Sequence, residues 1–123
     1  LRQQPGPWNA LGRFKFVFPN SYQVYLHDTP SKNLFSRTQR DFSHGCIRLE
    51  HAEELARLLL SELSKSQFER FKSNGQNKVV ALDQPLPVFV LYFTSWVDGQ
   101  GVLNFRKDIY GHDQRLESAF LSN

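Results

Sequence analysis

Ser-His-Gly-Cys-Ile-Arg at residues 43–48 contains the only cysteine of the 123-residue chain, Cys46. His27 stands nineteen residues before it, at the end of a strand-like segment. Cysteine attacks as the thiolate, so a cysteine enzyme needs a base within hydrogen-bond reach. It also needs donors for the oxyanion that forms when sulfur adds to a carbonyl. The sequence therefore makes Cys46 a candidate nucleophile and His27 its candidate base.

The neighbours of Cys46 suit such a site. Gly45 lets the backbone turn tightly or approach a ligand closely. His44 is held in the same short loop as the cysteine, which favours an oxyanion or scaffold role over that of base. Arg48 could bind a substrate carboxylate through two nitrogens, or form a solvated salt bridge. Without further information, Cys46 and His27 could equally be a buried inert thiol and a hydrogen-bonded core histidine.

Metal binding is a weaker interpretation of the same residues. His27, His44 and Cys46 are zinc-ligand types, but their spacing matches none of the usual paired patterns and only one thiolate is present. The two other histidines, His51 and His112, are predicted to be ordinary surface residues. The residues themselves therefore do not favour a zinc site.

A β-hairpin is predicted before the cysteine. Residues 13–18 alternate basic with apolar side chains, residues 22–27 are aromatic and β-branched, and Pro19-Asn20-Ser21 lies between them as a turn. The alternation puts His27 and Tyr25 on the face opposite the apolar side chains of residues 22–27. Residues 28–42 are predicted to form a surface loop with aromatic anchors.

Helices and further strands are predicted after the cysteine. Residues 50–63 carry strong helix formers with an apolar stripe, and a short second helix is predicted over 66–72. Residues 79–82, 87–93 and 101–105 are strand-like, and 87–93 is apolar on both faces, which is typical of a central strand. The tail beyond Tyr110 is predicted to be a surface helix or a frayed end. The order of elements indicates a β-rich α+β fold.

Composition limits the classes of function. The chain is 40% hydrophobic and 22% charged, which is typical of a globular domain, and its net charge of +3 is scattered rather than gathered into the stripe that nucleic acid requires. No apolar run approaches the roughly 20 residues of a membrane-spanning helix, and the first residues lack a signal-peptide pattern. A single cysteine leaves the compartment open.

The spacing and motif together resemble a known family. His27, a spacer of fifteen residues and then Ser43 to Arg48 match the signature of the L,D-transpeptidase catalytic domain at every fixed position. Residues 5–12 and 25–30 strengthen the resemblance, which is closest to the large periplasmic members from Gram-negative bacteria. The resemblance therefore implies a periplasmic, wall-associated enzyme.

The resemblance implies acyl transfer on peptidoglycan without any metal or cofactor. The Cys46 thiolate would attack the donor tetrapeptide stem and release D-alanine, and an acceptor stem would resolve the thioester into a 3→3 cross-link. Carbapenem β-lactams would acylate the same sulfur. The implied roles are His27 as base and the Gly45–Cys46 backbone with His44 at the oxyanion. Substrate binding would fall to Arg48, Tyr25 and Ser43.

The start of the chain departs from the family pattern. These domains usually open with several β-strands before the loop at residues 5–12, and no counterpart is visible. We therefore interpret residues 1–123 as the C-terminal part of a single catalytic domain. Its fold would be a β-rich mixed sheet or sandwich with one main helix after the cysteine. The remaining N-terminal part of the same protein is the expected partner.

Two other functions fit the same motif. Water could resolve the acyl-enzyme, which would make the chain an L,D-carboxypeptidase or a peptidase that trims cross-links or detaches a lipoprotein. Alternatively, a non-catalytic wall-binding module could keep the motif as scaffold. A transpeptidase and a hydrolase differ in whether an acceptor stem or water reaches the acyl-enzyme, and the motif does not encode that difference.

Overall fold

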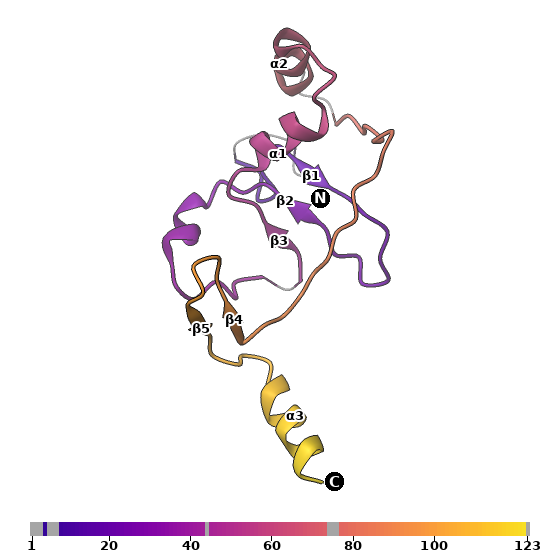
Figure 1. Ribbon diagram of the computed structural model, residues 1–123. Coiled ribbons are helices and arrows are strands. Elements are labelled where there is room, and N and C mark those ends of the chain that lie inside the picture. The colour runs from indigo at the N-terminus through magenta and orange to yellow at the C-terminus, as the bar shows by residue number, and fades with distance from the viewer. Residues whose placement is uncertain (1–3, 5–7, 44, 74–76, 123) are drawn as a thin grey trace. The chain divides into compact units, whose positions relative to one another are not determined.

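The computed structural model describes residues 4, 8–43, 45–73 and 77–122 (Figure 1). The chain divides into two compact units, Leu1–Leu86 and Pro87–Asn123, and the candidate site lies in the first. No helix within the described ranges is long and apolar enough to cross a membrane.

The first unit is built on a small mixed sheet of three strands (Figure 1). Strand β1 (Lys15–Phe16) runs antiparallel to β2 (Leu26–His27), and β2 runs parallel to β3 (Ile47–Arg48). The predicted hairpin is confirmed, although its ladder is only two residues long. The parallel pairing of β2 with β3 was not predicted, and it is this pairing that brings His27 and Cys46 to neighbouring strands.

Asn20 organises the connection between β1 and β2. Its amide nitrogen donates to the carbonyls of Phe18 and Val24 at 2.9 and 2.8 Å. Its amide oxygen accepts from the N–H groups of Tyr22 and Val24 at 3.1 and 3.0 Å. An asparagine that bonds its own neighbouring backbone stabilises a turn. These bonds take the place of ladder pairing and explain why the strands are shorter than the apolar pattern suggests.

Two helices follow β3, as predicted. Helix α1 (Ala52–Leu59) is shorter than the predicted 50–63, and α2 (Lys65–Ser73) matches the predicted short helix closely. The Ser64 hydroxyl accepts from the Gln67 N–H at 3.3 Å, and the Gln67 side chain accepts from the Ser64 N–H at 2.8 Å. This reciprocal capping box starts α2 and so limits how far α1 can extend.

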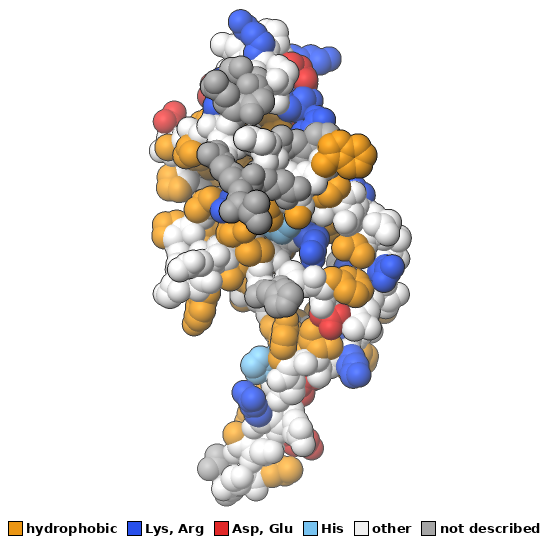
Figure 2. Space-filling view, turned by 180° about the vertical axis from the view of Figure 1, so that it is seen from behind, with side chains coloured by type: hydrophobic (Ala, Val, Ile, Leu, Met, Phe, Trp, Pro, Cys, Tyr) orange, Lys and Arg blue, Asp and Glu red, His pale blue; other side chains and the backbone are white. Residues whose placement is uncertain are grey.

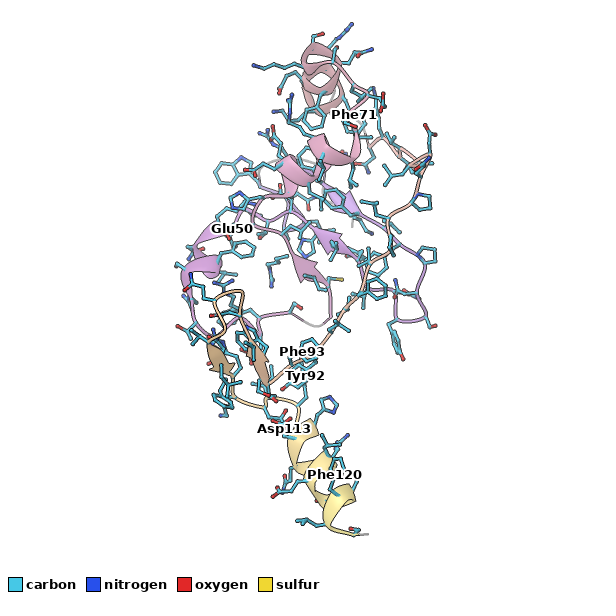
Figure 3. The ribbon with its side chains drawn as sticks, viewed as in Figure 1. Glu50, Phe71, Tyr92, Phe93, Asp113 and Phe120 are labelled. Atoms are coloured by element: carbon cyan, nitrogen blue, oxygen red, sulfur yellow. The ribbon has the colours of Figure 1, made fainter. Side chains whose placement is uncertain are left out.

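The buried core joins the helices to β1. It consists of Phe14, Ala52, Ala56 and Phe68, and Phe71 packs against it (Figure 3). The Phe14 and Phe68 rings are stacked with centroids 6.1 Å apart. Alanines on the buried stripe of α1 leave room for these rings, because a larger side chain at either position would overfill a close-packed interior.

Asp28 ties the loop before β1 to the chain after β2. Its carboxylate accepts from the Arg13 N–H at 3.0 Å and from the Lys32 ammonium at 2.9 Å. Lys32, in a 3₁₀ turn (Lys32–Ser36), also donates to the Glu50 carbonyl at 2.5 Å. Gly12 has a φ of +61°, and a Cβ there would clash with the Asp28 carboxylate. These contacts fix the segment that follows the candidate base.

We expect Asp28→Asn to lower the free energy of unfolding by about 1–2 kcal/mol at neutral pH, since it removes charge from two hydrogen bonds. Burial alone would raise the pKa of Asp28, but the hydrogen bonds from Arg13 and Lys32 outweigh it and lower that pKa below 3.8. The stabilisation is therefore present above the unfolded pKa and is lost as pH falls through the folded one.

Urea unfolding as a function of pH measures this effect. The difference in unfolding free energy between wild type and Asp28→Asn should shrink once the pH falls below about 4. Asp41→Asn, which changes an exposed carboxylate in the following loop, is the matched control. A difference that is constant with pH would contradict the assigned role of Asp28.

The second unit contains a hairpin and a terminal helix. Strand β4 (Ser95–Val97) pairs antiparallel with β5 (Leu103–Phe105), and α3 (His112–Leu121) follows. The Asp98 carboxylate accepts from the N–H groups of Gln100 and Val102 in the turn between the strands, both at 3.0 Å. The strand predicted over 101–105 is confirmed as β5, and of the two alternatives for the tail beyond Tyr110 the structure shows the surface helix.

Side chains before β4 organise the approach to α3. The Tyr92 hydroxyl donates to Asp108 at 2.7 Å, and the Asp108 carboxylate also accepts from the Asp113 N–H at 2.7 Å. Figure 3 labels Tyr92 and Asp113 near the start of this helix. The bond from Tyr92 is the largest of the effects that lower the pKa of Asp108 to about 2. An acidic side chain that accepts from the first turn of α3 stabilises that end of the helix.

The predictions for 79–82 and 87–93 are wrong. Neither segment forms a strand, and the strand that pairs across the 98–101 turn is β4 instead. Most of these side chains are exposed; Phe89, for example, is 80% accessible, and hydrophobic side chains are visible on the surface in Figure 2. Strand propensity expresses how well a side chain fits a pleated, partly buried surface. No described segment pairs with residues 87–93 to supply that surface.

The coarse fold class is confirmed, because the described chain is mixed α+β with small sheets and three α-helices; the β-rich sheet or sandwich of the prediction is not confirmed. Helix α1 is the one predicted directly after the cysteine. The expectation that the family's early strands are missing from this chain stays a prediction.

Candidate active site

The candidate nucleophile directly precedes β3, and the strand register places it on the same face as the candidate base in β2. Leu26 pairs with Ile47 and His27 with Arg48, and the Ile47 N–H donates to the Tyr25 carbonyl at 3.1 Å. Paired residues of parallel strands point to the same side, and side chains two apart share a face. Tyr25 and His27 therefore face the same way as Cys46 and Arg48.

The spacing of strands sets how far apart the two groups are. Adjacent strands are about 4.8 Å apart and rise about 3.3 Å per residue, so the Cα atoms of His27 and Cys46, two steps out of register, are about 8 Å apart. Side chains that extend toward each other from such diagonal positions can meet. The register thus supports the predicted pairing of His27 with Cys46.

The environment of His27 selects its tautomer. The ring is 4% exposed, and Nδ1 lies 2.5 Å from the Asp28 carbonyl oxygen. A carbonyl only accepts, so Nδ1 carries the proton in the neutral ring and Nε2 holds the lone pair. The backbone therefore orients the histidine and leaves Nε2 as the nitrogen that can accept a proton.

Tyr25 interacts with both His27 and Cys46. Its ring meets the His27 ring edge-on, with centroids 5.9 Å apart. Hydrogen bonding to the Cys46 thiol is the largest cause that raises the pKa of Tyr25, followed by burial and by the charge of the thiolate. The phenol therefore stays protonated and can donate to the sulfur.

Lys15 is a member of this group that the sequence analysis did not single out. Its ammonium lies 3.7 Å from the centroid of the Tyr25 ring, and Lys15 pairs with His27 across β1 and β2. A cation over an aromatic face is attracted by the ring quadrupole. The signal that could have found it is the predicted hairpin, whose register puts Lys15 opposite the candidate base.

The backbone before Cys46 has the conformation expected of a tight turn. Gly45 has a φ of +140°, which side chains with a Cβ rarely adopt, and its N–H donates to the Ser43 hydroxyl at 3.2 Å. Among the described residues the Cys46 N–H meets no acceptor. Cys46 thus offers the freer donor for an oxyanion. His44, predicted to share that role, lies outside the described residues.

An open pocket of about 290 Å³ adjoins the sulfur. Arg48, half-buried, lines it and donates to the Phe42 carbonyl at 3.2 Å. Ser43 and Cys46 also line it, so the predicted substrate-binding residues Arg48 and Ser43 share one pocket with the nucleophile. Tyr25 does not line this pocket and instead contacts the thiol. The predicted roles in substrate binding stay predictions.

Arg40 was also missed by the sequence analysis. It lines the same pocket, and its Nε donates to the Arg37 carbonyl at 2.8 Å. Residues 28–42 show no periodicity that would mark one arginine among several, so no local signal distinguishes Arg40. Its position depends on how the loop folds back toward β3.

The remaining histidines do not join the site. His51 is exposed and pairs with Glu54 at 3.0 Å, and His112 is exposed at the start of α3. No cluster of three or more His, Cys, Asp or Glu side chains within the described ranges has a metal-binding arrangement. His27 uses Nδ1 for the Asp28 carbonyl, which leaves it one nitrogen for chemistry.

Comparisons with known proteins identify the family of this chain. The family model of the L,D-transpeptidase catalytic domain (YkuD) matches residues 1–80, which fall within the first unit. A Haemophilus influenzae protein named "Putative L,D-transpeptidase" is 36% identical over 121 residues, which cover 97% of this chain and 24% of that protein. The chain thus spans about a quarter of this relative's length. It belongs to the L,D-transpeptidase catalytic domain family, a family of acyltransferases.

Proposed function

We propose that this chain carries the active site of an L,D-transpeptidase that forms 3→3 cross-links in peptidoglycan through a thioester on Cys46. One observation carries the proposal. Cys46 and His27 lie on one face of paired parallel strands, and the hydrogen bond from His27 Nδ1 to Asp28 leaves Nε2 as a base. Family membership supplies the class of reaction.

In the first half-reaction, His27 Nε2 takes the proton from the Cys46 thiol. The thiolate attacks the carbonyl carbon between the third residue of a donor tetrapeptide and its terminal D-alanine. The Cys46 N–H is the candidate donor to the oxyanion. When the tetrahedral intermediate collapses, Nε2–H returns the proton to the departing amine, D-alanine leaves and a thioester remains.

In the second half-reaction, the side-chain amine of a diaminopimelate in an acceptor stem attacks the thioester. His27 accepts the proton that the amine loses, and the thiolate leaves as the new amide bond forms. Tyr25, which contacts the thiol and stays protonated, would donate to the sulfur whenever it carries charge. The Ser43 hydroxyl and the Arg48 guanidinium would position the donor in the adjoining pocket.

This reaction implies a cellular location for the protein and a class of covalent inhibitor. Peptidoglycan stems are found outside the cytoplasmic membrane, so we place the protein in the periplasm at the cell wall. A carbapenem presents a strained lactam carbonyl to the same thiolate, and we expect a covalent adduct on Cys46. The donor and acceptor stems would be its partners, together with the remaining part of the same protein.

Mass spectrometry of muropeptides tests the proposal. The intact protein is incubated with purified tetrapeptide substrates, and products are identified by mass. Cross-linked dimers together with released D-alanine support transfer. Tripeptide alone would show that water resolves the thioester and would make the enzyme an L,D-carboxypeptidase. No product and no carbapenem adduct on folded protein would leave a non-catalytic wall-binding module.

A further inference from the structure

We propose that the pocket beside Cys46 binds a carboxylate of the donor peptide between Arg40 and Arg48, and that Arg40 makes the site selective for donors with that carboxylate free. This inference rests on the proposed function, since it assigns a specificity to the donor of the acyl group. The sequence motif includes Arg48 but gives no role to Arg40.

Charge in the pocket favours an anion. Arg40 and Arg48 line the same cavity as Cys46, and among the described residues no acidic side chain lines it. Among the described residues neither guanidinium forms an ion pair, since every ion pair found there involves Lys32, His51 or Lys72. Two cationic groups without a carboxylate partner repel each other, and an anionic ligand bound between them would reduce that repulsion.

One hydrogen bond to a backbone carbonyl orients each guanidinium, and its other N–H groups remain available as donors. Arg40 uses Nε for the Arg37 carbonyl, and Arg48 uses Nη1 for the Phe42 carbonyl. A guanidinium has five N–H donors, so each retains several for a ligand. Anchoring by the backbone reduces the rotamer entropy lost when a carboxylate binds.

The rest of the lining fits the apolar part of a peptide. Phe42 and Ile47 lie on the pocket wall with the two arginines, and the volume of about 290 Å³ suits a fragment of one amino acid rather than a polymer. A donor seated here would have its carboxylate at the arginines and its scissile carbonyl near the sulfur. Both the terminal residue and the diaminopimelate side chain of a tetrapeptide carry such a carboxylate.

The test uses the intact protein and three synthetic tetrapeptide donors: one with both carboxylates free, one with a terminal carboxamide and one with the diaminopimelate side-chain carboxyl amidated. The rate of thioester formation on Cys46 is followed by intact mass. We expect wild type to lose about 10- to 100-fold in rate with one of the amidated donors, as expected for loss of a charge-assisted hydrogen bond. Which donor is affected identifies the carboxylate.

Variants of Arg40 assign the effect. With the donor whose carboxylates are both free, Arg40→Gln should form the thioester about as slowly as wild type does with the amidated donor to which it is sensitive. Amidation of that donor should not slow Arg40→Gln further. Arg40→Lys should recover part of the rate, because it restores the positive charge but not the paired N–H donors of the guanidinium. Arg70→Gln on the exposed α2 helix is the matched control and should behave as wild type.

Two results would overturn the inference alone: wild type that accepts all three donors at rates within about twofold, or Arg40→Gln that keeps the wild-type preference. If wild type forms no thioester with any donor, the proposed function itself fails, and the inference fails with it. Whether wild type forms a thioester with the donor whose carboxylates are both free therefore distinguishes failure of the inference alone from failure of the proposed function.

Discussion

Cys46→Ala abolishes acyl transfer and leaves the protein folded. We expect the rate of donor turnover to fall by at least about 10⁴-fold, because the variant has no atom that can form the thioester. The stability of the fold should change by less than about 1 kcal/mol, since Cys46 is only half-buried and lies outside the core cluster. Intact mass after incubation with donor or carbapenem measures the first effect, and urea unfolding measures the second.

Cys46→Ser is the closest control for this variant. It keeps the size of the side chain and a hydroxyl that Tyr25 can bond, but the hydroxyl is a far weaker nucleophile than a thiolate at neutral pH. We expect it to fold as wild type does and to form no measurable acyl-enzyme on the timescale of the thiol. Cross-linked muropeptides from either variant, above the level of a no-enzyme sample, would refute Cys46 as the nucleophile.

Elements with strong local patterns were predictable from the sequence. The apolar stripe of α1 and the serine-to-glutamine spacing that caps α2 are both encoded within a single turn or two of helix. The hairpin of β1 and β2 was also predictable, because Asn20 and its neighbours form a turn that brings adjacent segments together. In each case the decisive contacts are close in sequence.

Contacts between distant residues were not predictable in this way. The parallel pairing of β2 with β3 joins residues about twenty apart, and no periodicity in either segment records it. The prediction that His27 and Cys46 act together came from the resemblance of the motif to a known family, not from any local pattern. Lys15 and Arg40 reach the site through the same long-range arrangement, which explains why both were missed.

The apolar stretch 87–93 shows the opposite failure. Its composition is that of a central strand, yet it forms none, because a strand is stabilised by cross-strand neighbours rather than by its own side chains. A segment rich in Val, Phe and Leu is stabilised when its side chains are buried. Its composition does not state what covers it.

Replacement of His27 is the second large effect we expect, and it tests the assigned base. His27→Ala should slow thioester formation about 10²- to 10⁴-fold at neutral pH, because no other described side chain on the strand face offers an oriented nitrogen lone pair to the thiol. The rate of the variant should rise steeply with pH as solvent takes over deprotonation of the sulfur. Stopped-flow acylation by a carbapenem, followed across a pH series, measures both features.

Because His27 is 4% exposed, its removal also leaves a cavity, so a loss of activity alone would not separate catalysis from folding. His27→Asn resolves this: its amide N–H can replace Nδ1–H as donor to the Asp28 carbonyl, but it supplies no base. We expect this variant to unfold at nearly the wild-type urea concentration and yet acylate as slowly as the alanine variant. His51→Asn, at an exposed histidine paired with Glu54, should acylate at the wild-type rate. If His27→Asn acylates at that rate too, the thiol proton goes elsewhere, and the loop residue His44 becomes the candidate base.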